Sequence, residues 1–121
     1  MDYMLQIYYS FTPLRLVTSR KEPVRLAVEI TNNGNASKMA SLEVILPKEL
    51  SFGKARFKRD ITERINSLAP REKREFTYEL YAQPMYIQPG DKKITLRANE
   101  LKRINLVEAS YERVISLTVS D

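Results

Sequence analysis

The chain contains no cysteine and no histidine among its 121 residues. Without cysteine there is no disulfide framework, no thiolate nucleophile and no thiolate metal site. Without histidine there is no Ser-His-Asp or Cys-His catalysis, no common zinc site and no ordinary proton shuttle near neutral pH. These two absences lead us to expect no catalytic residues, no cofactor and no bound metal.

Long apolar runs are absent as well. No stretch approaches the roughly 18 residues needed to cross a bilayer, and the start, Met1-Asp2-Tyr3-Met4, lacks the basic and then apolar regions of a secretory signal. We therefore expect no membrane span and a cytoplasmic location for the chain as given. If it was cut from a longer exported protein, the expected location becomes extracellular or the cell surface.

The composition is that of a globular domain. Hydrophobic residues make up 43% and charged residues 29%, unlike the apolar-poor, charge-dominated composition of disordered chains. A chain of this length can bury a core without metals or disulfides. We expect one domain that covers residues 1–121.

Apolar and polar residues alternate with period two in most segments, which is typical of half-buried strands. The clearest case is Val24 to Thr31, where the even-numbered residues Val24, Leu26, Val28 and Ile30 share one face. That face is predicted to be buried, and the face with Thr31 to be exposed. Similar alternation occurs in the segments 5–9, 14–17, 41–46, 52–58, 76–81, 94–98 and 115–119.

Residues that favour turns separate these segments. Asn32-Asn33-Gly34-Asn35 tolerates positive φ and predicts a hairpin between the strands on either side of it. The mixed charge run from Arg71 to Glu75 is typical of a solvated loop. Residues 99–110 show helical spacing without a capping box, so we interpret them as a long connection that projects from the sandwich as an extended hairpin.

About seven short strands with frequent turns and no long amphipathic helix predict an all-β fold. The expected architecture is an immunoglobulin-like sandwich of about seven antiparallel strands in two sheets. Within it, residues 52–58 are expected to form an edge strand.

Three landmarks in the chain resemble those of a known family, the cell-adhesion-related (CARDB-like) domains of archaea and bacteria. They are the strand and Asn-x-Gly turn of residues 24–36, the Leu68-Ala69-Pro70 landmark, and Pro89-Gly90 ahead of a strand. Arg71 stands where the family often has glycine. The resemblance implies an immunoglobulin-like fold and a role as a spacer or docking module without catalytic residues.

Two hypotheses for function follow. The first is a noncatalytic protein-protein interaction or docking module, including self-association through edge strands, whose free N–H and C=O groups can accept a partner strand. The alternative is a polyanion binder, either of nucleic acid or of an acidic surface, that uses the basic strand face of Lys54, Arg56 and Lys58 in a chain with a net charge of +5. No small-molecule substrate is expected. The candidate partner-binding residues are Lys54, Arg56, Lys58, Arg59, Leu101, Ile104 and Leu106.

Overall fold

The computed structural model describes residues 4–20, 22–53, 59–83 and 88–120. Within these ranges the chain forms nine strands and one short 3₁₀ helix, Thr18–Arg20. The strands are β1 (Leu5–Thr12), β2 (Arg15–Val17), β3 (Val24–Asn32), β4 (Lys38–Ile45), β5 (Leu50–Phe52), β6 (Asp60–Leu68), β7 (Lys73–Ala82), β8 (Gly90–Arg103) and β9 (Leu106–Ser120).

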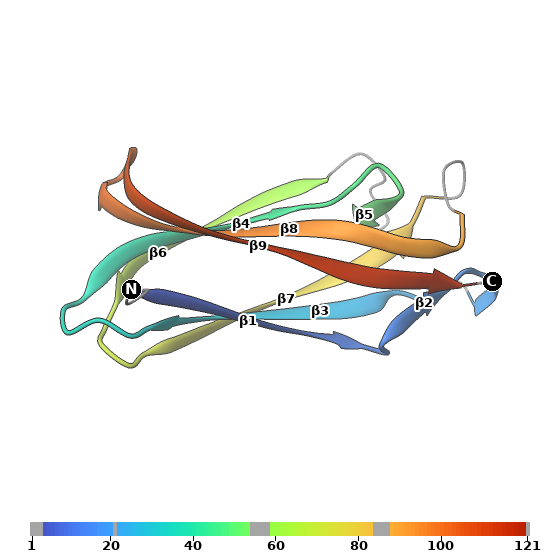
Figure 1. Cartoon of the computed structure of the whole chain (residues 1–121), viewed down its shortest axis with the longest axis horizontal. Helices are drawn as coiled ribbons and strands as arrows, with labels where there is room; N and C mark the ends of the chain where they lie inside the picture. Colours follow the sequence, from blue (N-terminus) through green and yellow to red (C-terminus); the bar gives the residue numbers. More distant parts are fainter. Residues whose placement is uncertain (1–3, 21, 54–58, 84–87, 121) are drawn as a thin grey trace.

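The strands form two stacked sheets; in Figure 1, β4, β8 and β9 of one sheet run above β1 and β3 of the other. The four-stranded sheet has the order β1-β3-β7-β5, and the five-stranded sheet has the order β2-β9-β8-β4-β6. The expected all-β sandwich is confirmed. Two of the nine strands, β2 and β5, have only three residues. β2 lies within the segment 14–17, β5 shares only Phe52 with the expected strand 52–58, and β6 was not among the segments with recognised alternation. β2 also pairs in parallel with β9, whereas only antiparallel pairs were expected.

The core lies between the two sheets and is built by the predicted alternation. Val24, Leu26, Val28 and Ile30 of β3 are all buried, as are Ile94, Leu96 and Ala98 of β8. Each strand thus presents one apolar face to the other sheet, as alternating side chains require. Thr31 departs from the prediction, because it is buried at the end of β3 although its parity assigned it to the exposed face.

The prediction of a hairpin at Asn32 to Asn35 is wrong. β3 lies in one sheet and β4 in the other, so the chain crosses between the layers at this turn. The Asn32 side chain is fully buried and donates to Ala36 O and Leu68 O, and its Oδ1 accepts from Gly34 N. These bonds attach the turn to the end of β6 in the opposite sheet, which is why the chain does not fold back beside β3.

The charge run from Arg71 to Glu75 was predicted to be a solvated loop, but only Arg71 and Glu72 precede strand β7, which begins at Lys73. Glu72 Oε1 accepts a bond from Ala69 N, and Oε2 lies 2.9 Å from the Arg74 guanidinium. The Ala69 bond first, and then Arg74, lower the pKa of the Glu72 carboxyl. Arg71 has a φ of 68°, the conformation for which glycine is the usual residue.

Phe52 differs from its predicted orientation. The parity that grouped it with Lys54 assigned it to an exposed face, but β5 ends at Phe52, whose ring is buried against Tyr78. β5 does form an edge of the four-stranded sheet. Residues 54–58 of the expected edge strand lie outside the described residues.

The stretch 99–110 is strand rather than loop for most of its length. β8 continues to Arg103 and β9 begins at Leu106, so the two strands form one long hairpin with a turn at Ile104 and Asn105. The extended hairpin that we expected is therefore present, and it bends away from the four-stranded sheet at its end (Figure 1). None of the helices in the described part of the chain is long and apolar enough to span a bilayer.

Candidate functional site

The outer face of the five-stranded sheet carries two rows of polar side chains that cross four strands. Register places Arg64 of β6, Ser41 of β4, Asn99 of β8 and Ser110 of β9 in one row. The neighbouring row consists of Thr62, Glu43, Arg97 and Glu112. Strand alternation directs all these side chains away from the apolar core.

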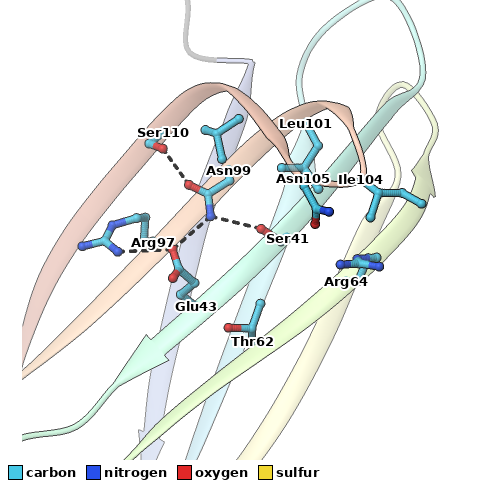
Figure 2. Close-up of a pocket in the computed structure, with 11 residues that line it drawn as sticks. Ser41, Glu43, Thr62, Arg64, Arg97, Asn99, Leu101, Ile104, Asn105 and Ser110 are labelled. Carbon is cyan, nitrogen blue, oxygen red and sulfur yellow. Dashed lines mark hydrogen bonds and ion pairs between the residues drawn. The ribbon is translucent and has the colours of Figure 1, made fainter.

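Asn99 is the centre of a hydrogen-bond network between the two rows. Its Nδ2 donates to Ser41 Oγ and Glu43 Oε2, each at 3.0 Å, and its Oδ1 accepts from Ser110 Oγ at 2.6 Å (Figure 2). The side chain is only 5% exposed although it lies on the outer face. A buried amide with all these partners is held in one orientation, so the network fixes the floor of this surface.

Arg97 bridges two carboxylates in the second row. Its guanidinium lies 2.9 Å from Glu112 Oε1 and 3.2 Å from Glu43 Oε2. The hydrogen bond that Arg97 donates to Glu112, followed by the one that it donates to Glu43, raises the pKa of Arg97. The charges of Glu43 and Arg97 are thus paired with each other within the sheet.

The bend of the β8–β9 hairpin makes this face concave. A cavity of about 470 Å³ is lined by the two polar rows on one side and by Leu101, Ile104, Asn105 and Val107 of the hairpin on the other (Figure 2). Register shifts around Leu101 accompany the bend, as expected for β-bulges, which increase local twist and redirect side chains. The cavity therefore has a hydrogen-bonded polar floor and an apolar wall.

The end of the hairpin exposes apolar side chains next to basic ones. We define the hairpin tip as residues 102–107. Ile104 is 55% exposed, Leu106 47% and Val107 51%, while Lys102 and Arg103 are exposed beside them. Large apolar side chains that gather in this way typically mark an interaction site, whereas single exposed ones need no explanation.

Arg64 differs from Arg97 in having no ion-pair or hydrogen-bond partner among residues 4–20, 22–53, 59–83 and 88–120. It is exposed on β6, the edge strand of the sheet, and it lines the cavity. This guanidinium is therefore available to a carboxylate from outside the molecule.

The structure brings together part of the predicted candidate set. Ile104 and Leu106 are both exposed at the hairpin tip, whereas Leu101 is buried in the wall of the cavity. Arg59 is exposed just before β6, at the end of that strand away from the hairpin tip, because the neighbouring Asp60 pairs with Ile45 and Ile45 pairs with Thr95. Lys54, Arg56 and Lys58 lie outside the described residues. Their role in binding stays a prediction.

The polar rows were missed by sequence reasoning. Ser41 and Asn99 stand at alternating polar positions, which are typical of any solvated strand face, so their composition gave no indication of a network. The only signal in the sequence was that both residues stand at outward-facing positions of their strands. Once β4, β8 and β9 are placed side by side, these positions share a face. The order of the strands, however, depends on contacts between residues far apart in sequence, such as the bond from Asn32 to Leu68 O.

A separate buried ionic cluster lies on the core side of the same hairpin. Glu100 is buried, accepts a hydrogen bond from the Tyr111 hydroxyl and lies 3.5 Å from Lys38 Nζ. Burial first, and then the bond to Glu100, raise the pKa of Tyr111. The part of the chain that the structure describes contains no cluster of three or more acidic residues able to hold a metal ion.

The comparisons with known proteins concern the fold. No protein-family model and no curated protein sequence matches the chain. Among solved structures, it is similar to a FixG-related protein from Vibrio parahaemolyticus, with a TM-score of 0.62 and 14% identity over 98% of both chains. It is also similar to the native alpha-2-macroglobulin of Escherichia coli, with a TM-score of 0.68 and 15% identity, covering 95% of this chain and 16% of that one.

A third similar structure is self-complemented MyfA, the major subunit of Myf fimbriae from Yersinia enterocolitica. The TM-score is 0.54 and the identity 15%, over 96% of this chain and 99% of that chain. Together with the two stacked sheets, these similarities define the chain as an all-β domain with an immunoglobulin-like fold. The fold expected from the resemblance is confirmed at this level.

Proposed function

We propose that the chain is a noncatalytic protein-interaction module that docks a partner on the hairpin tip and the adjoining cavity. The observation that carries this proposal is the exposure of Ile104, Leu106 and Val107 together at one end of the sandwich. Burial of such side chains against a partner contributes about 25 cal/mol for each Å² of apolar surface removed from water.

The cavity gives the docking surface its shape. Its floor is fixed by the Asn99 network, so little conformational entropy is lost there when a partner binds. Its apolar wall, with Leu101 and Ile104, accommodates an aliphatic or aromatic side chain of the partner. A rigid polar floor beside an apolar wall is a suitable receptor for one anchoring side chain.

The charge beside the tip indicates the chemistry of the partner. Lys102 and Arg103 are exposed next to the apolar residues, and the chain carries a net charge of +5. A partner with acidic residues around an apolar anchor is therefore favoured, because complementary charge at the rim steers encounter.

The known proteins with this fold support a role in assembly, although they share only the fold with this chain. One of them is a major fimbrial subunit, and another is an alpha-2-macroglobulin of which this fold forms a small part. We also propose that the chain belongs to the cell-adhesion-related family and acts as part of an exported protein.

The experiment is site-specific photo-crosslinking in the source cell. A photoreactive amino acid at Asn105, within the tip, is expected to give discrete adducts that mass spectrometry identifies as one protein. The same probe at Thr77, an exposed position on the opposite sheet, serves as the matched control. Adding Ile104→Asp to the Asn105 probe is expected to abolish the adducts.

Equal labelling from Asn105 and Thr77, or adducts that survive Ile104→Asp, would contradict docking at the tip. Polyanion binding predicts a different result, namely nucleic-acid affinity that falls steeply with salt. Filter binding at two salt concentrations measures that affinity directly.

A further inference from the structure

The edges of the two sheets differ in how far they are open to another strand. β2 and β5 have three residues each, and β2 covers only Thr118 to Ser120 of the longer strand β9. The edge of β1 is occupied at Ile7, whose carbonyl accepts a bond from the Arg113 guanidinium of β9, and the same guanidinium lies over the Tyr9 ring. Short strands and inward-turned charges are devices that prevent edge pairing.

β6 has neither form of protection. It is nine residues long and pairs with β4 on one side, and no described strand lies on its other side. It contains no proline, so every residue of the strand keeps its N–H group. A long edge with free backbone groups is a template for a strand from another chain.

The register shows which backbone groups of β6 are free. Leu46 N donates to Arg59 O, and the pairing of β4 with β6 runs without interruption from Ile45–Asp60 to Ala40–Ile65. Because N–H and C=O groups alternate in direction along a strand, residues 61, 63 and 65 point toward β4. The backbone groups of Asp60, Thr62 and Arg64 therefore point away from the sheet.

The side chains of the same three residues lie on the outer face and are exposed. Among the described residues, neither the Asp60 carboxylate nor the Arg64 guanidinium has an ion-pair partner. They are four positions apart on one face, with Thr62 midway between them. This arrangement is self-complementary under a two-fold rotation centred on Thr62.

We propose that a second copy of this chain pairs antiparallel with β6 across a two-fold axis at Thr62. Each Asp60 then lies opposite the partner copy's Arg64, so that two ion pairs flank the axis. About six backbone hydrogen bonds join the copies, and the five-stranded sheets become continuous. The contact is isologous, as in most dimers.

The charges select this register over its neighbours. Opposed residues in an antiparallel pair have their side chains on the same face. In a symmetric pair they must therefore be an even number of positions apart in the sequence, and the two-fold axis passes beside the residue midway between them. An axis at Glu63 sets the two glutamates against each other, and an axis at Arg64 does the same with the two arginines. Like charges directly opposite each other destabilise a strand pair, and among residues 60–68 of β6 only the axis at Thr62 makes opposite charges meet.

This inference rests on the proposed role as an interaction module and shares Thr62 and Arg64 with the cavity, but not the hairpin tip. Ile104→Asp changes the tip alone, so it distinguishes failure of the one proposal from failure of the other. Sedimentation velocity over a range of concentrations is expected to show a monomer–dimer equilibrium. Thr62→Pro removes the N–H group that points away from the sheet and leaves every bond between β6 and β4 intact. This variant is expected to abolish the dimer. Thr62→Ala keeps the N–H and is the matched control, which is expected to dimerise.

Charge reversal tests the register. Asp60→Arg and Arg64→Asp are each expected to raise the dimer dissociation constant by about tenfold or more, because each sets like charges opposite each other at two symmetric places. The double variant restores opposite charges and is expected to recover the affinity of the original chain. Recovery in the double variant shows that the single variants did not fail through misfolding.

The absence of native cysteine allows a direct check. Opposed residues in a strand pair have Cα atoms about 5.5 Å apart, within the range of a disulfide. Thr62→Cys is therefore expected to form a covalent dimer under mild oxidation, and Thr77→Cys is expected not to. A monomer at all concentrations would overturn the proposal, as would a dimer that survives Thr62→Pro or is abolished by Ile104→Asp.

Discussion

Asn32 connects three parts of the chain through its side chain and backbone. The side chain donates to Leu68 O and Ala36 O and accepts from Gly34 N, and its backbone exchanges bonds with Glu72 O and Arg71 N. Asn32→Ala removes the three side-chain bonds and leaves the backbone bonds in place, so unfolding is expected to require about 2–4 kcal/mol less free energy. Chemical denaturation measures this loss. Asn33→Ala changes an exposed side chain and should cost less than about 0.5 kcal/mol; equal losses would contradict the assigned role.

Thr31 offers a stabilising change. Its Oγ1 is buried without a hydrogen-bond partner within the described part of the chain, and a buried hydroxyl without a partner costs about 1–3 kcal/mol. Thr31→Val keeps the shape and the β-branch, and we expect a gain of about 1 kcal/mol, seen as a higher melting temperature. Thr31→Ser keeps the hydroxyl and is expected to give no gain. A lower melting temperature for Thr31→Val would indicate that the hydroxyl has a partner.

At the scale of single strands, most of the fold could be predicted from the sequence. The faces of β3 and β8 follow from alternation, because each has one side in the core. Phe52 and Thr31 were misplaced for a physical reason: each lies at a strand end, where burial depends on what covers the end rather than on parity. The tip residues Ile104 and Leu106 were candidates because the connection that contains them was expected to project from the sandwich, and both are exposed there.

The polar rows on β4, β8 and β9 allow two kinds of interaction, a buried amide network and partly exposed ion pairs, to be compared on one face of a sheet. Asn99 is buried with three partners, so Asn99→Ala is expected to destabilise the domain by about 2–3 kcal/mol. Arg97 forms partly exposed ion pairs, which contribute little to stability because solvent screens them. Arg97→Ala is therefore expected to cost less than Asn99→Ala. Paired denaturation curves decide the order, and the reverse order would show that the ion pairs dominate this face.

At the scale of the whole molecule, the sequence indicates the strands but not their partners. The turn at Asn32 has the residues of a hairpin, yet it carries the chain from one sheet to the other, because Asn32 bonds with Leu68 of the opposite sheet. That crossover places β4 in the five-stranded sheet, where it pairs with β8 and β6, and this pairing puts Asn99, Ser41 and Arg64 on one face. Contacts between residues far apart in sequence leave no local pattern, so the cavity could not be predicted.

The contact between the sheets at Tyr78 is expected to make the whole domain less stable at alkaline pH. Tyr78 of β7 donates to Glu63 of β6, and burial first, then the Glu63 charge, raise its pKa well above the ordinary value of 10.0. In the unfolded chain the hydroxyl ionises near that value, whereas in the folded domain it stays protonated. The stabilisation is therefore fully present below pH 10 and is lost as the pH rises above it, by at most about 1.4 kcal/mol per pH unit. Denaturation curves between pH 8 and about pH 11.5 measure the decline. Tyr78→Phe cannot ionise, so its stability is expected to fall less steeply above pH 10, and parallel curves for the two proteins would contradict the assignment.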